Sequence, residues 1–159
     1  MAVKSIPEGY HTVTPALIVN DGQKALDFYK KAFDAKERFK MNTPDGRIGH
    51  AELQIGDSII MLSDEFPEMK CLSPKSIGGS SVSIFLYVED VDAVFNTAVS
   101  SGAKILDEVK DQFWGDRHGS LEDPFGHRWS ISTHKKDLSP EELKQAAEAA
   151  FAKMSNGAK

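Results

Sequence analysis

The sequence has one cysteine, no long apolar run and no excess of positive charge. Cys71 has no partner for an intramolecular disulfide, and we interpret it as a thiol without a catalytic role because no base stands near it. With a formal net charge of -5, the chain lacks the cationic surface that binds nucleic acid. No stretch reaches the roughly 18 apolar residues of a membrane span, and the first residues lack a signal peptide's apolar core. We therefore expect a cytoplasmic protein with no nucleic-acid or membrane partner.

The sequence contains the same order of predicted elements twice: a strand, a helix and three strands. Residues 12–19 form a β-branched apolar run that predicts a strand, and Asn20-Asp21-Gly22 ends it. A helix is predicted next, because apolar residues recur at helical spacing: Ala25, Phe28, Tyr29, Ala32 and Phe33. Three short strands follow it, at 36–41, 48–55 and 58–63. The same order restarts at residue 82 with landmarks about 68 to 70 residues further on, which indicates a tandem repeat.

The predicted organisation has four parts. The first strand-helix-three-strand module covers 10–63 and the second covers 82–134. Between them, residues 64–81 are rich in proline, glycine and serine and predict a linker. A C-terminal helix is predicted at 139–154, because Ser139 and Glu142 form a capping box and Pro140 suits the first helical position. Its face of small residues predicts docking against the body or a second subunit.

The order and spacing of these motifs resemble a known family. The segments VNDGQKALDFYKKAFDAK, DGRIGHAELQIGDSIIMLSDE and FWGDRHGSLEDPFGHRWSIS together resemble the vicinal oxygen chelate superfamily of glyoxalases, bleomycin-resistance proteins and dioxygenases, with the closest likeness to its PhnB-like branch. The resemblance covers about residues 10–134 and implies an α+β fold. In that fold, tandem βαβββ modules form curved mixed sheets around a shared cavity, and here a C-terminal helix is added. It also implies a homodimer, often with modules exchanged between chains.

Enzymes of this superfamily hold a divalent metal with one residue from the first and last strand of each module. Carried over by position, these residues are Thr14, Ser83 and Ser130, with Ile60 or Met61 as the fourth. Zinc, nickel, manganese and iron prefer imidazole or carboxylate ligands, which none of these side chains supplies. We therefore expect no metal cofactor and disfavour glyoxalase I activity, so that whether the protein is an enzyme stays open.

Strand alternation gives a second, independent prediction of the cavity wall. In 48–55, Ala51, Leu53 and Ile55 form the apolar face, so His50 and Glu52 point into the cavity. The same reasoning assigns six cavity positions in the second module: Ser83, Phe85, Tyr87, Arg128, Ser130 and Ser132. Trp129 and Ile131 are predicted to pack in the core.

The stretch 113–132 is first a hairpin, with a type I turn at Asp123-Pro124-Phe125-Gly126. Trp114 can stack a planar group and Arg117 can pair with a carboxylate or phosphate, so both are candidate ligand contacts. The alternative for Arg117 is a salt bridge to Asp111 or Asp116. His118 alternates with Arg117, so a regular strand turns only one of them to the cavity.

The leading hypothesis is a protein that binds or sequesters a small organic molecule in a metal-free cavity. The ligand-binding candidates are Thr14, His50, Glu52, Met61, Ser83, Phe85, Tyr87, Trp114, Arg117, Arg128 and Ser130. The alternative is a metal-assisted or acid/base lyase, isomerase or dioxygenase in which His50 and Glu52 are ligands or catalytic groups. Two donors do not make a metal site, so a divalent metal in this alternative requires a third donor, which His118 or Glu122 would have to supply. A third hypothesis is an interaction module whose cavity is filled by its own side chains.

Overall fold

The computed structural model describes residues 3–156 and contains two βαβββ modules. In the first, β1 (Ala16–Val19) and α1 (Gly22–Phe33) precede β2 (Lys36–Asn42), β3 (Ile48–Ile55) and β4 (Ser58–Asp64). In the second, β5 (Ser83–Tyr87) and α3 (Val91–Ser100) precede β6 (Lys104–Asp111), β7 (Asp116–Glu122) and β8 (Arg128–His134). The sheet orders are β1-β4-β3-β2 and β5-β8-β7-β6, and in each the first and last strands pair in parallel. The predicted α+β repeat is therefore confirmed.

Three segments differ from the sequence predictions, two in where a strand begins and one in its secondary structure. β1 begins only at Ala16, after Pro15, whose carbonyl accepts from the Met61 amide but which has no amide hydrogen of its own. β7 begins at Asp116, so Trp114 lies in the preceding turn. The linker is not structureless, because it contains the 3₁₀ turn η1 (Pro67–Met69) and the one-turn helix α2 (Pro74–Ile77).

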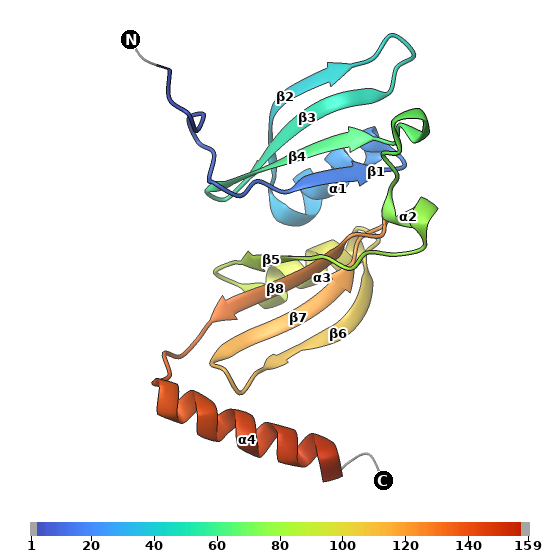
Figure 1. The fold of residues 1–159 in the computed structure, drawn as a ribbon. Helices are drawn as coiled ribbons and strands as arrows, with labels where there is room; N and C mark the ends of the chain where they lie inside the picture. Colours follow the sequence, from blue (N-terminus) through green and yellow to red (C-terminus); the bar gives the residue numbers. More distant parts are fainter. Residues whose placement is uncertain (1–2, 157–159) are drawn as a thin grey trace.

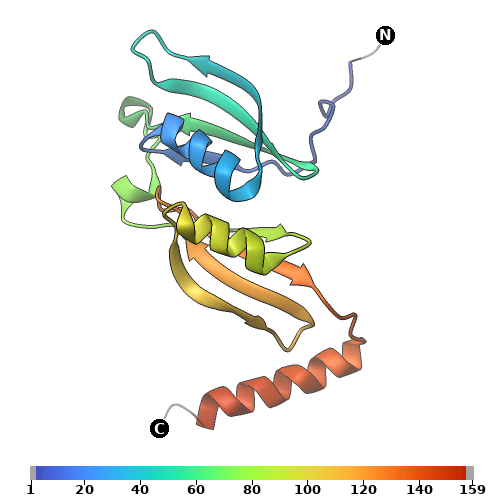
Figure 2. The ribbon, with the colours of Figure 1, turned by 180° about the vertical axis from the view of Figure 1, so that it is seen from behind.

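Both long module helices lie on one side of the two sheets, side by side (Figures 1 and 2). Each begins with an aspartate N-cap, Asp21 or Asp90, whose side chain accepts an amide hydrogen bond in the first turn. The opposite faces of the sheets carry no helix in these views, so the sheets do not close around a cavity within one chain. We call these two surfaces the open faces.

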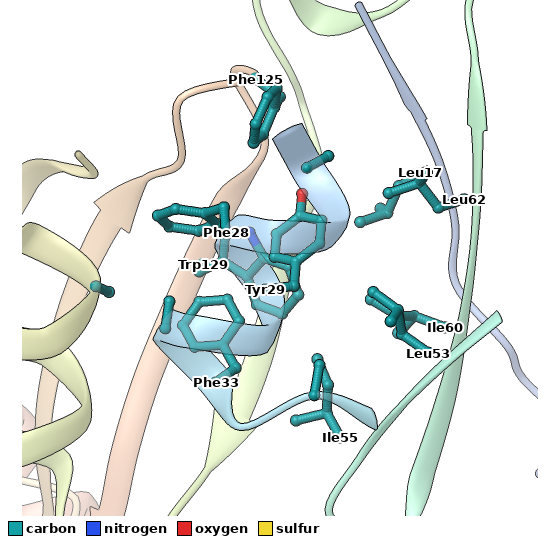
Figure 3. Close-up of a cluster of buried hydrophobic side chains, with 14 of the residues drawn as sticks. Leu17, Phe28, Tyr29, Phe33, Leu53, Ile55, Ile60, Leu62, Phe125 and Trp129 are labelled. Carbon is teal, nitrogen blue, oxygen red and sulfur yellow. The ribbon is translucent and has the colours of Figure 1, made fainter. Parts of the chain in front are cut away.

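One core joins the modules at the helix side (Figure 3). Phe33 of α1 stacks obliquely on Trp129 of β8, with ring centroids 4.5 Å apart. Asp123, only 2% exposed, accepts hydrogen bonds from the Tyr29 hydroxyl at 2.6 Å and the Trp129 indole at 2.9 Å. Two turn amides, Phe125 and His127, bond its other oxygen. The buried carboxylate thus fixes the second module against the first helix.

The C-terminal helix α4 (Pro140–Asn156) begins with the predicted capping box, in which Ser139 and Glu142 bond each other's backbone amides. It lies beyond the second module in Figure 1 and touches the β6–β7 turn through Phe151 and Phe113, whose centroids are 5.9 Å apart. No helix among residues 3–156 is long and apolar enough to cross a membrane.

Candidate functional site

The open face of the first module is formed as alternation predicts. Ala51 and Leu53 are fully buried against α1, so His50 and Glu52 point to the other side of β3. Ile48 is also buried, although it has the parity of His50, because the ladder shifts between Met41 and Asn42 and leaves Gly49 as an extra residue. The bulge at Gly49 therefore turns Ile48 to the buried side of the sheet, although His50, two residues on, faces the open side.

The pairing of β3 with β4 resolves the ambiguous metal position. Ile60 lies opposite Leu53 and is 3% exposed, whereas Met61 lies opposite Glu52 on the open face. Thr14 precedes β1 and its hydroxyl donates to the His11 carbonyl, so the predicted strand position of this residue is wrong. The proline that follows it explains the shorter strand.

His50 and Glu52 form a pair, and Tyr10, from the segment before β1, lies beside it. The His50 Nε2 atom lies 3.3 Å from a Glu52 carboxylate oxygen. The Tyr10 hydroxyl has the largest effect and lowers the pKa of Glu52, desolvation opposes it by raising the pKa, and the bond with His50 lowers the pKa again, so the net shift is downward. Glu52 is thus ionised at neutral pH and can orient the imidazole.

The open face of the second module carries a group of rings that we call the aromatic cluster: Phe85, Tyr87, Trp114 and His118. Phe85 stacks on His118 at a centroid distance of 5.4 Å and packs beside Tyr87 at 5.2 Å. Trp114 meets His118 edge-on at 5.8 Å. The Ser83 and Ser130 hydroxyls are hydrogen-bonded to each other at 3.1 Å on the same face. This arrangement offers flat apolar surfaces beside hydroxyl groups.

Asp116 is the carboxylate that organises this face, although the sequence pattern indicated it only as a partner for Arg117. It is 4% exposed and accepts from the Tyr87 hydroxyl at 3.0 Å, the Trp114 indole at 3.1 Å and His134 Nδ1 at 2.7 Å. Desolvation raises the pKa of Asp116, but these three hydrogen bonds outweigh it and the net shift is downward. Two rings of the aromatic cluster are therefore held by one ionised group.

His118 and His134 have opposite environments. Burial lowers the pKa of His118, whose Nδ1 lies 2.9 Å from the Ser132 hydroxyl, so this imidazole is neutral at pH 7. His134 lies between two carboxylates, and its hydrogen bonds to Asp137 and Asp116 raise its pKa. A neutral imidazole has only one N–H, so both contacts of His134 are satisfied together only by the imidazolium form.

Arg117 does not lie where the ligand hypothesis requires. Its side chain faces α3, where it makes a bidentate pair with Asp92 at 2.7 and 2.8 Å, and it also contacts Asp111 at 3.2 Å. The salt-bridge alternative therefore describes this residue, with Asp92 as the main partner. On the same side of β7, a Cβ on Gly119 would lie 2.9 Å from the Phe95 ring, which explains the glycine. His118 is the residue that faces the cluster, and Arg128 is exposed at the start of β8.

The residues at the superfamily's metal positions do not fit a metal. Ser83 and Ser130 bond each other, Met61 offers a thioether, and Thr14 is outside the strand. Within residues 3–156, no group of three or more histidine, cysteine, aspartate or glutamate side chains is arranged to hold an ion. In particular, His50 and Glu52 gain no third donor of these types.

A hollow of about 750 Å³ lies between the modules and adjoins the cluster. Tyr87 and His134 contribute to its wall, together with Phe33 at the end of α1 and Val94 of α3. Its volume is in the range of small-molecule pockets, although it is open to solvent. Of the four rings in the aromatic cluster only Tyr87 borders this hollow, whose other walls include α1 and α3, so it lies at the helix side and not over the open face.

Comparison with known proteins now places the chain. The sequence profile of the Glyoxalase/Bleomycin resistance protein/Dioxygenase superfamily matches residues 10–131. The chain belongs to this superfamily. An uncharacterized protein of Mycobacterium tuberculosis is 43% identical over 137 residues, covering 84% of this chain and 81% of that protein. Membership alone does not decide the chemistry of this site.

Two solved structures share the fold. TioX from Micromonospora sp. ML1 is 25% identical with a TM-score of 0.61, covering 78% of this chain and 98% of TioX. The fosfomycin resistance protein FosX from Listeria monocytogenes, solved as a mutant with Mn(II) and 1S,2S-dihydroxypropylphosphonic acid, is 17% identical with a TM-score of 0.60. It covers 85% of this chain and 96% of FosX. At that identity FosX is evidence for the fold alone.

Proposed function

We propose that the protein binds and sequesters a small organic molecule without a metal, and that the aromatic cluster is the main contact surface. The observation that carries this proposal is the set of rings on the second open face, two of which are fixed by the buried carboxylate of Asp116. Rings held in place lose little entropy on binding, and they favour a ligand with a planar part. The sequence segments quoted above support placement in the PhnB-like branch, and a cytoplasmic location stays a prediction.

A homodimer is part of this proposal. Large apolar side chains remain exposed on both open faces: Phe39 is 50% and Met41 53% exposed in the first module, and Phe85 is 49% and Tyr87 62% exposed in the second. Contiguous exposed apolar surface of this kind marks interaction or ligand sites. We propose that the first module of one copy covers the second module of another and that the ligand lies between them, with no nucleic acid or membrane involved.

The test uses 2-naphthol as a neutral planar probe and cyclohexylmethanol as its non-planar control, both in buffer with a chelator. Ligand-observed NMR is expected to show saturable binding of 2-naphthol that weakens several-fold in Phe85→Leu and Trp114→Leu, because each loses a stacking surface. Phe151→Leu is the matched control, since Phe151 is also exposed but lies on α4. Equal binding by all three variants, or binding that the chelator abolishes, would refute the proposal.

A second candidate function is acid/base catalysis by His50, favoured by the ionised Glu52 beside it. In this arrangement His50 takes a proton from a bound substrate and Glu52 stabilises the imidazolium that forms. Substrate screening for lyase and isomerase activity tests it with His50→Gln and Glu52→Gln. A turnover that survives both substitutions would exclude this role for the pair.

A further inference from the structure

Arg38 occupies a special position in the edge strand β2. Glu37 pairs with Leu53 and Phe39 pairs with Glu52, so Arg38 is an extra residue in the ladder. Bulges of this kind re-aim a side chain and are common beside binding sites. The same shift occurs one repeat later between Ile105 and Asp107, where the extra residue is Leu106. The fold therefore keeps the bulge in both modules, but only the first places a guanidinium there.

The segment before β1 is shaped to support this guanidinium. Gly9 adopts a φ of +81°, which is unfavourable for other residues, and the turn brings the Tyr10 amide to the Pro7 carbonyl at 3.1 Å. The Tyr10 ring then lies under Arg38, with 5.8 Å between the guanidinium carbon and the ring centroid. Since the Tyr10 hydroxyl also lowers the pKa of Glu52, Tyr10 lies between Arg38 and the His50–Glu52 pair.

Arg38 differs from Arg47 and Arg117 in its partners, whereas Arg128, like Arg38, has no carboxylate partner within residues 3–156. Arg47 pairs with Asp45 and Glu68, and Arg117 pairs with Asp92 and Asp111. Among the described residues, Arg38 has no carboxylate within 4.0 Å, and the neighbouring Glu52 pairs with His50 instead. The guanidinium is exposed, so its five N–H donors are available to a ligand.

We propose that Arg38, supported by Tyr10, is a recognition site for an oxyanion, the carboxylate or phosphate group of a small organic ligand. This inference rests on the proposed function and adds that the ligand is anionic. A guanidinium matches both anions through two parallel hydrogen bonds. An anion held there lies on the same open face as His50, which places the remainder of the ligand over the first module.

The experiment follows the Nε–H signals of the arginine side chains by ¹⁵N NMR. Phenyl phosphate, benzoate and neutral benzamide are titrated at constant ionic strength, so that charge screening does not change. The two anions are expected to give a saturable shift of the Arg38 signal and benzamide none. The signals of Arg47 and Arg117 serve as internal controls, because their donors are already paired. The anion that binds more tightly shows whether the ligand's charged group is a phosphate or a carboxylate.

Two variants and one matched control complete the test. Arg38→Gln is expected to weaken anion binding about tenfold or more, and Tyr10→Leu several-fold, because the ring no longer holds the guanidinium. Lys153→Gln, which removes an exposed positive charge from α4, is expected to leave binding unchanged. A linear shift of all signals, or loss of binding in Lys153→Gln, would overturn the inference.

This outcome is separable from that of the proposed function. Binding of 2-naphthol is expected to persist in Arg38→Gln, since the aromatic cluster belongs to the second module. If 2-naphthol binds but no anion reaches Arg38, the inference fails and the proposed function stands. If anions saturate Arg38 but 2-naphthol does not bind, the aromatic cluster is not the contact surface and the anion site stands.

Discussion

Tyr29→Phe is expected to destabilise the protein by about 2 kcal/mol, although it removes a single oxygen atom. Tyr29 is fully buried and donates to Asp123 at 2.6 Å, and burial raises the pKa of its hydroxyl well above the usual value, so it remains a donor at all working pH values. A hydrogen bond to a charged acceptor contributes about 1.5–3 kcal/mol, and Asp123 would keep its three other donors. For a chain of 159 residues this corresponds to a fall in Tm of about 4–8 °C.

The assay is urea unfolding followed by circular dichroism and by tryptophan fluorescence, which reports on Trp129 at this site together with Trp114. Asp123→Leu is expected to cost more, about 3–5 kcal/mol, because it leaves the Tyr29 hydroxyl and the Trp129 indole buried without an acceptor. In the double variant Tyr29→Phe/Asp123→Leu part of that cost returns, which gives a coupling of about 0.5–3 kcal/mol. Ser58→Ala, which removes an exposed hydroxyl that donates to the Asp57 carboxylate, is the control and changes stability by less than about 0.5 kcal/mol. Additive effects would refute the claim that this hydrogen bond joins the modules.

Three further predictions concern other parts of the chain. Gly115→Ala is expected to destabilise the fold by more than about 1–3 kcal/mol, because φ is +98° and a Cβ would lie 2.2 Å from the Lys136 carbonyl oxygen. Gly46→Ala is the control, since Gly46 has a similar φ but open space around its Cα. Equal melting temperatures of the two variants would contradict this prediction. Because the pKa of His134 is raised, its stabilising contribution is complete below about pH 6.5 and is lost as the pH rises through the raised pKa. The melting temperatures of the wild type and His134→Gln are therefore expected to converge in alkaline buffer. A difference that does not change with pH would exclude this contribution of the imidazolium. The melting temperature is expected to stay unchanged on addition of manganese, iron(II), nickel or zinc. If the purified protein instead contains a stoichiometric metal that is lost in His50→Ala, the protein is a metal enzyme and the sequestering model is wrong.

The rings and polar residues of the two open faces were largely predictable. Alternation in β3 and β5 places His50, Glu52, Phe85 and Tyr87 correctly, because one buried face fixes the direction of every second side chain. Alternation fails where the ladder gains a residue, as at Gly49 and Arg38, since a bulge depends on the partner strand and has no local sequence signal. The choice between Ile60 and Met61 likewise required the pairing of two strands.

The sequence by itself determined the repeat, the module helices with their aspartate caps, and the poor donor chemistry of the superfamily's metal positions. These features depend on local propensity and on residue type, which are present in the chain before it folds. The tertiary structure alone decided that Arg117 pairs with Asp92, that Asp116 is buried beneath Tyr87 and Trp114, and that Tyr10 supports Arg38. Each of these contacts joins residues from different elements, so its partner is chosen by how helices and sheets pack and not by spacing along the chain.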